Sequence, residues 1–306
     1  MCSLTLIPTA LVLAIAPAGL AKGKLSPLAA STPIANVSAL DKFGLVIGID
    51  SYTNTASLTS SVRDAKEFAQ MLQDHFGFDN VVVMTTDTAR QALLPNRANI
   101  NEVLQNFVAD LHKDSQVVVF FSGHATSTTG SGSANADWLI PSDGAASDLP
   151  GTCINYEDVR EALDKAKPGR VLIVCDIRGL PANGKAIGDS SNFGDLALKK
   201  HSGPEIIELF ACQSSEESQD GDDFPESVFA HYLITGLQGD SEAADPNTGL
   251  ITYDTLLNYV QTKVSQYVLS HFNDQQTPTG HASEGDIVFV QTSTQALPAT
   301  PAANGR

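Results

Sequence analysis

The sequence predicts an α/β fold in which helices cover both faces of a mostly parallel sheet. Continuous apolar runs of strand length lie at residues 43–50, 117–121 and 170–176, and such runs are typical of strands that are buried on both faces. Between them, apolar residues recur at helical spacing in residues 62–72 and 100–111. Strands that alternate with helices of this length form a parallel sheet between two helical layers.

The remaining elements follow in the same alternating order. Segments rich in Gly, Ser, Thr or Asn predict longer loops at residues 126–136 and 178–203. We expect further strands at 80–86, 138–141, 205–212 and 286–290, and further helices at 156–165, 230–237 and 252–269.

The chain divides into a leader, one globular domain and a tail. Residues 1–40 are rich in Ala, Ser and Pro and predict a leader with a linker, residues 41–291 form the domain, and residues 292–306 are a Pro/Ala-rich tail. Residues 4–21 are apolar and end in small residues typical of signal-peptide cleavage, although no Lys or Arg precedes them. We therefore expect export, with a cytoplasmic location as the alternative, and no membrane span in the mature domain.

Composition and charge exclude several classes of partner. The 306 residues are 42% hydrophobic, which is enough for a full core, and carry a net charge of −17. Nucleic-acid backbones and anionic membrane surfaces bind basic patches, so neither is expected as a partner, whereas a basic peptide is attracted. The four cysteines form no C-x-x-C pair and have no His at zinc-ligand spacing, so we expect no metal and no cofactor.

The apolar run at 117–121 leads directly into Ser122-Gly123-His124. Parallel α/β sheets place their ligand and catalytic groups beyond the carboxyl ends of their strands. Histidine is the commonest general base, so His124 is a candidate for that role. Such a role requires a nucleophile close to the imidazole.

Several segments together resemble the caspase-like cysteine peptidases, in particular their metacaspase and bacterial caspase-like branch. They occur in the family's order and span roughly residues 43–291. The resemblance implies a three-layer α/β/α sandwich around a mostly parallel six-stranded sheet. The segments are residues 43–52, Asp64-Ala65, Ser122-Gly123-His124, 138–143, the strand ending at Asp176, and 210–218 with the following 229–239 and 250–252.

The resemblance implies a Cys-His dyad, but the nucleophile position differs in this chain. The family has Asp-x-Cys after the second buried strand, whereas this chain has Asp176-Ile177-Arg178. A guanidinium is always protonated and cannot act as a nucleophile. The sequence therefore predicts a pseudopeptidase that keeps His124 and lacks the cysteine that it would activate.

The resemblance also assigns Asp64 and Asp176 to an acidic pocket that accepts Arg or Lys. Because Arg178 lies two residues from Asp176, we hypothesise that its guanidinium pairs with these carboxylates and fills the pocket from within. The expected partner is then a basic peptide or protein segment, or an active caspase-like relative. The family's calcium-binding Asp-Asp pair is missing near residues 154–156, so no metal is predicted.

Two alternatives keep catalytic activity. In the first, the chain is a cysteine endopeptidase that cleaves after Arg or Lys and uses His124 with Cys212. In the second, Ser122 is the nucleophile of a hydrolytic α/β domain, although it precedes His124 too closely to face it comfortably. Cys175 lies three residues before Arg178 in a predicted strand and therefore points to the opposite face.

Overall fold

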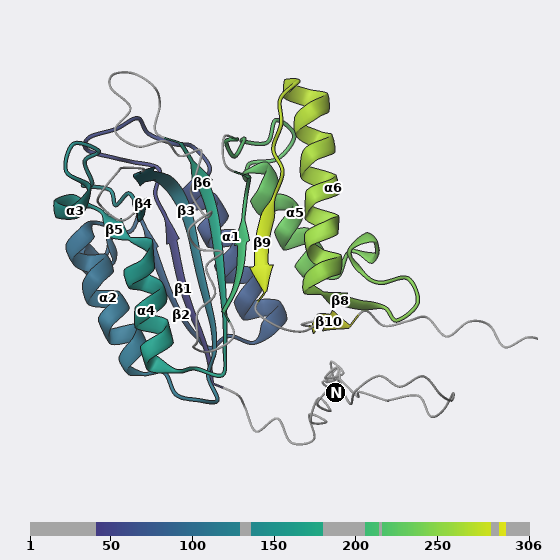
Figure 1. Cartoon of the computed structure of the whole chain (residues 1–306), viewed down its shortest axis with the longest axis horizontal. Helices are drawn as coiled ribbons and strands as arrows, with labels where there is room; N and C mark the ends of the chain where they lie inside the picture. Colours follow the sequence, from purple (N-terminus) through teal and green to yellow (C-terminus); the bar gives the residue numbers. More distant parts are fainter. Residues whose placement is uncertain (1–40, 129–135, 180–205, 214–215, 283–287, 292–306) are drawn as a thin grey trace, which may run out of the picture. The chain divides into compact units, whose positions relative to one another are not determined.

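The computed structural model describes residues 41–128, 136–179, 206–213, 216–282 and 288–291. The predicted leader at 1–40, the tail at 292–306 and most of the predicted loop at 178–203 lie outside these residues. The described part is a sheet with helices on both faces (Figure 1). None of its described helices has the length and hydrophobicity needed to cross a membrane.

The central sheet has a path of six strands, of which the first five run parallel. Its order is β2-β1-β3-β6-β7-β9, and β9 runs antiparallel to β7. The predicted class, a mostly parallel six-stranded sheet, is confirmed. The strands are β1 (Lys42–Gly48), β2 (Asn80–Thr85), β3 (Gln116–Thr128), β6 (Arg170–Arg178), β7 (Ile206–Phe210) and β9 (Thr279–Ala282).

Shorter elements extend this sheet or lie beside it. The end of β3 pairs antiparallel with β4 (Ala136–Leu139), which in turn pairs with β5 (Ile154–Asn155). A separate two-stranded sheet joins β8 (Leu250–Thr252) to β10 (Val288–Gln291). The short helices are α3 (Leu149–Thr152), η1 (Gln91–Leu93) and η3 (Ser241–Ala243).

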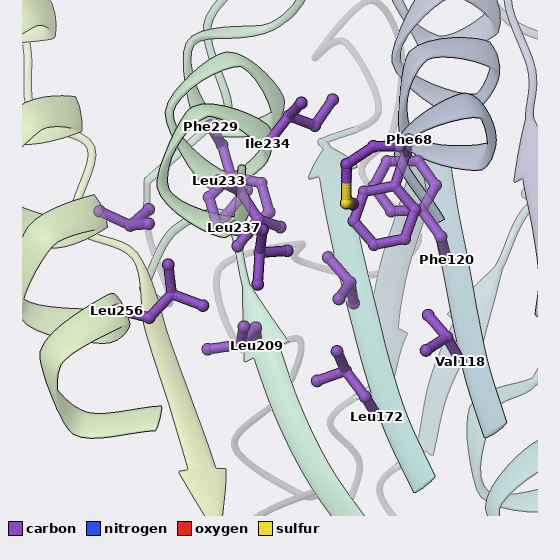
Figure 2. Packing of buried hydrophobic residues seen from close by; sticks show 14 of the residues in the cluster. Phe68, Val118, Phe120, Leu172, Leu209, Phe229, Leu233, Ile234, Leu237 and Leu256 are labelled. Atoms are coloured by element: carbon purple, nitrogen blue, oxygen red, sulfur yellow. The ribbon is translucent and has the colours of Figure 1, made fainter. Parts of the chain in front are cut away.

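Side-chain alternation along the strands divides the core into one hydrophobic cluster on each face of the sheet. One cluster lies against α1 (Ser61–Phe76), α5 (Val228–Leu237) and α6 (Tyr253–Phe272). Figure 2 shows part of it, where Phe68 stacks on Phe120 of β3 at a centroid distance of 4.4 Å. The other cluster lies against α2 (Arg97–Ala109) and α4 (Tyr156–Ala166).

Two sequence predictions about strands need correction. The strand that leads into His124 does not stop at its apolar run, because pairing with β4 carries β3 on to Thr128, into the predicted loop at 126–136. Likewise, the sixth strand of the sheet is β9 and not the predicted strand at 286–290, whose counterpart β10 pairs with β8. The sequence Thr-Gly-His-Ala of β9 has no apolar run, so hydrophobic patterning could not identify it.

Candidate active site

The β3–β6 register places the predicted site residues side by side. Along this parallel pair, Ser122 lies opposite Asp176 and His124 lies opposite Arg178. These residues share the strand face of Phe120, which is the face that α1 and α5 cover. Asp64 reaches the same place from the first turn of α1. The structure therefore brings His124, Arg178, Asp64 and Asp176 together at the carboxyl end of the sheet.

His124 is buried, and main-chain carbonyl groups surround its ring. Nδ1 lies 3.2 Å from the carbonyl oxygen of Arg178 and 3.1 Å from that of Gly179, while Nε2 lies 3.0 Å from that of Ala56. Burial lowers the pKa of His124, and the three carbonyl groups oppose this shift. Among the described residues, neither ring nitrogen forms a hydrogen bond with a thiol or a hydroxyl group.

Tyr52 fixes the backbone of the Ser-Gly-His segment. The His124 main-chain N–H donates to the Tyr52 hydroxyl at 2.8 Å, and the two rings lie 4.8 Å apart between centroids. A Cβ atom at position 123 would lie 2.6 Å from the Tyr52 hydroxyl oxygen. Gly123 is therefore needed because only glycine leaves room for this hydrogen bond.

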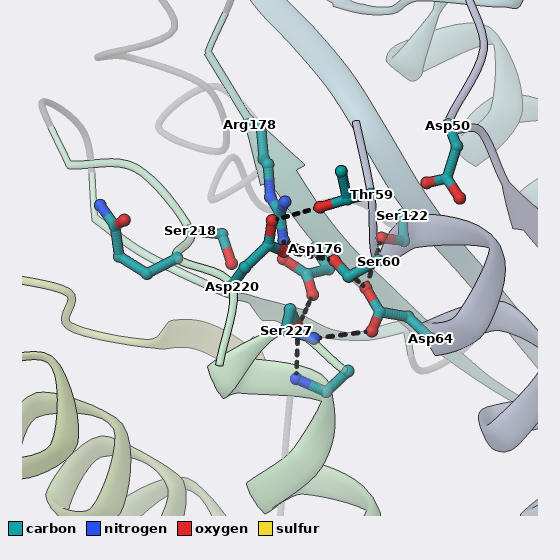
Figure 3. Close-up of polar contacts among 12 residues, drawn as sticks. Asp50, Thr59, Ser60, Asp64, Ser122, Asp176, Arg178, Ser218, Asp220 and Ser227 are labelled. Atoms are coloured by element: carbon teal, nitrogen blue, oxygen red, sulfur yellow. Dashed lines mark hydrogen bonds and ion pairs between the residues drawn. The ribbon is translucent and has the colours of Figure 1, made fainter. Parts of the chain in front are cut away.

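Arg178 points into the protein, with only 8% of its surface exposed. Its Nη2 lies 2.6 Å from Oδ1 of Asp220 and donates to the Ser60 hydroxyl at 2.9 Å (Figure 3). Burial alone would lower the pKa of Arg178, but the carboxylates of Asp176, Asp220 and Asp64 raise it above its ordinary value.

The direct partner of Arg178 differs from the hypothesised one. We expected a pairing with Asp64 and Asp176, but among the described residues Asp220 is the carboxylate within ion-pair distance of the guanidinium. Asp64 and Asp176 act on Arg178 through longer-range attraction. Sequence analysis missed Asp220 because it lies in an acidic turn that looks like solvated surface. Its Asp-Gly pair signals the turn but not the partner.

Asp64 and Asp176 are both fully buried. Asp64 accepts hydrogen bonds from the Ser122 hydroxyl at 2.9 Å and from the Ser227 main-chain N–H at 2.8 Å, and Asp176 accepts one from the Ser227 hydroxyl. Burial raises the pKa of both carboxyl groups; the charge of Asp176 raises that of Asp64 further, whereas Arg178 opposes both shifts.

Asp220 links the pocket to the loop before α1. It accepts hydrogen bonds from the Ser60 hydroxyl at 2.5 Å and the Thr59 hydroxyl at 2.8 Å. Burial would raise the pKa of Asp220, but Arg178 and these hydroxyl groups lower it below its ordinary value. We call Asp64, Asp176 and Asp220 together with Arg178 the acidic pocket; it holds more carboxylates than cations.

The described cysteines lie outside this pocket, although the charge of Asp176 also helps to raise the pKa of Cys212. Cys212 and Cys175 belong to the hydrophobic cluster on the α2–α4 face, opposite to the face of Arg178. The Cys212 thiol donates to the Glu216 carbonyl at 3.4 Å, and burial raises its pKa far above the ordinary value. Cys153 packs with Ile140 and Leu149 in a third, smaller cluster. Burial also raises the pKa of Cys175 and Cys153.

Two further sequence predictions concern Ser122 and metals. The Ser122 hydroxyl donates to the Asp64 carboxylate, so it is engaged on the α1 side of the sheet. Within the described ranges, no group of three or more His, Cys, Asp or Glu residues is arranged to hold a metal ion.

The comparisons agree with this fold and with the order of the motifs. The family model of the caspase domain, peptidase family C14, matches residues 41–285. This chain therefore belongs to the caspase domain family.

The similar sequences include metacaspases, although the alignments cover only part of each. Metacaspase-4 of Arabidopsis thaliana is 24% identical over 67% of this chain and 45% of its own length. Metacaspase-1 of Debaryomyces hansenii is 31% identical over 27% of this chain and 19% of its own length. The chain thus spans less than half the length of these curated relatives.

Solved structures show the same fold at low sequence identity. Protein GSU0716 from Geobacter sulfurreducens has a TM-score of 0.54 and 15% identity, covering 79% of this chain and 93% of its own. Caspase-1 from Spodoptera frugiperda has a TM-score of 0.52 and 14% identity, covering 83% of this chain and 92% of its own.

Proposed function

We propose that this chain is a caspase-like pseudopeptidase whose acidic pocket is filled by its own Arg178. One observation carries the proposal. Arg178 lies directly opposite His124 across two paired strands, and its guanidinium is buried against Asp220 and Ser60. In the family's pattern, the nucleophilic cysteine belongs at this position.

The chemistry of the neighbouring groups supports the loss of catalysis. Covalent catalysis of this kind needs a thiolate within reach of the base, and a guanidinium cannot replace it. The thiols of Cys175 and Cys212 lie on the other face of the sheet, where burial keeps them protonated. The carbonyl groups around the His124 ring favour a role in holding β3, β6 and the Ala56 loop together.

A pseudopeptidase acts through binding. The occupied pocket affects the binding of its two expected partners differently. A basic peptide segment can enter the acidic pocket only after Arg178 has left it, because the guanidinium occupies the hydrogen-bonding groups of Asp220 and Ser60. An active caspase-like relative needs no empty pocket, since it can bind another surface. The occupied pocket therefore favours the relative as the partner of the resting state.

Hydrolysis of fluorogenic peptides with Arg or Lys before the reporter group tests this proposal. We expect purified protein to show no turnover above the rate without protein, at any reducing-agent or calcium concentration. The alternative, an endopeptidase that uses His124 with Cys212, predicts turnover that a Cys212→Ala substitution abolishes. Cys153→Ala is the matched control because Cys153 is also a buried free thiol. Turnover lost in the first variant and kept in the second would refute the pseudopeptidase.

A further inference from the structure

We infer that residues 219–228 form a latch that holds Arg178 in the acidic pocket and is itself fastened to α5 and α6. This inference rests on the proposed function. The segment is a hairpin, in which Asp220 and Ser227 form an antiparallel bridge. The Val228 N–H donates to the Gln219 carbonyl at 2.9 Å, and the Gly221 N–H donates to the Glu226 carbonyl at 3.0 Å.

The base of the hairpin forms one wall of the acidic pocket. On one strand, Asp220 pairs with Arg178. On the other, the Ser227 main chain donates to Asp64 and its hydroxyl group donates to Asp176 (Figure 3). Any movement of the base therefore removes the ion-pair partner of Arg178 and two hydrogen bonds of the buried carboxylates.

The Tyr267 hydroxyl group on α6 fastens the tip of the hairpin. It accepts hydrogen bonds from the Asp222 N–H at 3.0 Å and the Asp223 N–H at 3.2 Å, and donates to the Asp223 carboxylate at 3.2 Å. His271 stacks on the Tyr267 ring at a centroid distance of 3.9 Å, and its Nε2 lies 3.2 Å from the Asp223 carboxylate.

Phe224 makes the apolar contacts that hold the tip of the hairpin. Its ring stacks on His231 of α5 at 3.8 Å and lies 5.1 Å from the Tyr267 ring. The turn must be tight for this contact, since a Cβ atom at Gly221 would lie 2.2 Å from the Phe224 ring. A few side chains thus hold the tip, while Asp222 and Asp223 are exposed.

Through these contacts, the tip of the hairpin influences the ion pair between Asp220 and Arg178 at its base. The Ser227 end of the base is held separately, as the N-cap of α5, and the Gln219 N–H donates to Gln276 at 2.9 Å. If the tip leaves His231 and Tyr267, the strand that carries Asp220 loses its outer contacts, and Asp220 can leave Arg178. The guanidinium then becomes accessible together with the acidic pocket. Elements of this kind, with few buried apolar contacts, belong to the low-stability part of a fold and open locally.

Labelling of arginine side chains by phenylglyoxal, followed by peptide mapping, measures this opening. In the unsubstituted protein we expect Arg178 to react far more slowly than Arg63, whose side chain is 52% exposed. Tyr267→Phe removes the hydroxyl contacts, so the Arg178 rate should rise about fivefold to tenfold, in keeping with the usual net value of a hydrogen bond. Arg90, an exposed arginine outside the hairpin, should react at an unchanged rate.

Tyr259→Phe is the matched control. Tyr259 lies on the same helix, but its hydroxyl group donates to Asp240 at 2.8 Å and contacts no residue of the hairpin. Its substitution should leave the Arg178 rate unchanged. Phe224→Ala, a second variant within the hairpin, should raise the Arg178 rate as Tyr267→Phe does, which keeps the test informative if the tyrosine variant folds poorly.

Two outcomes would overturn the latch. In the first, hydrogen exchange at the Gly221 N–H accelerates in Tyr267→Phe while Arg178 labelling does not. In the second, Tyr259→Phe accelerates labelling as much as Tyr267→Phe does. Failure of the proposed function has a different signature, since Arg178 would then react as fast as Arg63 in the unsubstituted protein.

Discussion

Two buried ionisable clusters lie on opposite faces of the sheet and differ in charge balance. On the α2–α4 face, Arg160 Nε lies 3.2 Å from Oε1 of Glu208, and the Tyr156 hydroxyl donates to the same oxygen at 2.7 Å. In this Glu208 cluster the buried Arg160 guanidinium is within ion-pair distance of buried Glu208 and, at 3.6 Å, of the half-exposed Glu157. In the acidic pocket, one guanidinium faces the carboxylates of Asp64, Asp176 and Asp220.

The difference separates a structural ion pair from a pocket whose charge suits the proposed binding role. A guanidinium with a single fully buried carboxylate partner, as in Arg160 and Glu208, is enough to fix α4 on β7. Additional carboxylates cost desolvation and repulsion, which shows in the raised pKa of Asp64 and Asp176. Folding alone does not need this surplus of negative charge. Its place at the carboxyl end of the strands is where a binding site is expected.

The largest expected effect comes from removing the single cation of the acidic pocket. Arg178→Met leaves buried carboxylates uncompensated, so we expect a loss of roughly 3–5 kcal/mol in the free energy of unfolding at pH 7. Denaturant titration measures it. Arg90→Met is the control, because Arg90 is exposed and lies outside the pocket and the hairpin, so its loss should cost less than about 0.5 kcal/mol. Equal losses in the two variants would show that Arg178 is not needed to balance the pocket.

The second prediction concerns how much of the lost stability a second substitution restores. Adding Glu208→Gln to Arg160→Met removes both charges of the pair, so most of the lost stability should return, with a coupling energy of about 2–3 kcal/mol. Adding Asp220→Asn to Arg178→Met should recover less stability, about 1 kcal/mol, because the charges of Asp64 and Asp176 remain. Equal coupling energies in the two double-mutant cycles would remove the distinction between the clusters.

The third prediction is a pH dependence that belongs to the Glu208 cluster. Burial raises the pKa of Glu208 from 4.5 to about 7, while Arg160 opposes the shift. The native state therefore binds this proton more tightly than the unfolded state does. The resulting stability is fully present below about pH 4.5 and is lost as the pH rises through about 7, by roughly 3 kcal/mol. Stability curves of Glu208→Gln should lack this component.

An exposed carboxylate provides the control for that pH profile. Glu161→Gln removes a side chain that is 53% exposed and should leave the profile unchanged. If Glu208→Gln retains the full decline between pH 4.5 and 7, the decline has another origin.

The smallest expected effect tests the segment that holds His124. Tyr52→Phe removes the acceptor of the His124 N–H, so the free energy of unfolding should fall by about 1 kcal/mol. Tyr232→Phe, at a half-buried tyrosine on α5, should cost less. A larger loss in Tyr232→Phe would mean that the Tyr52 hydrogen bond adds little to this site.

Much of the fold followed from the sequence because it depends on local patterns. The apolar runs of β1, β3 and β6 and the helical spacing of α1 and α2 predicted the central elements. By contrast, β9 was missed because its pairing with β7 depends on tertiary contact and not on hydrophobic residues. The end of β3 was also misplaced, since Ser-Gly usually marks a turn.

The candidate site was predictable where it follows the strands. His124, Asp176 and Arg178 lie on adjacent strands, so their neighbourhood follows from strand order and register. Asp220 and the 219–228 hairpin reach the site through long-range packing. Nothing in an acidic turn indicates that one of its carboxylates meets an arginine far away in the sequence.

Covalent labelling of the position opposite His124 tests the central proposal most directly. The probe is a peptide with an arginine followed by a thiol-reactive ketone, and intact mass with peptide mapping reports the adduct. We expect the unsubstituted protein to stay unmodified and the Arg178→Cys variant to gain one adduct at position 178, because the base and the carboxylates remain in place. An adduct at Cys212 in the unsubstituted protein would contradict the pseudopeptidase.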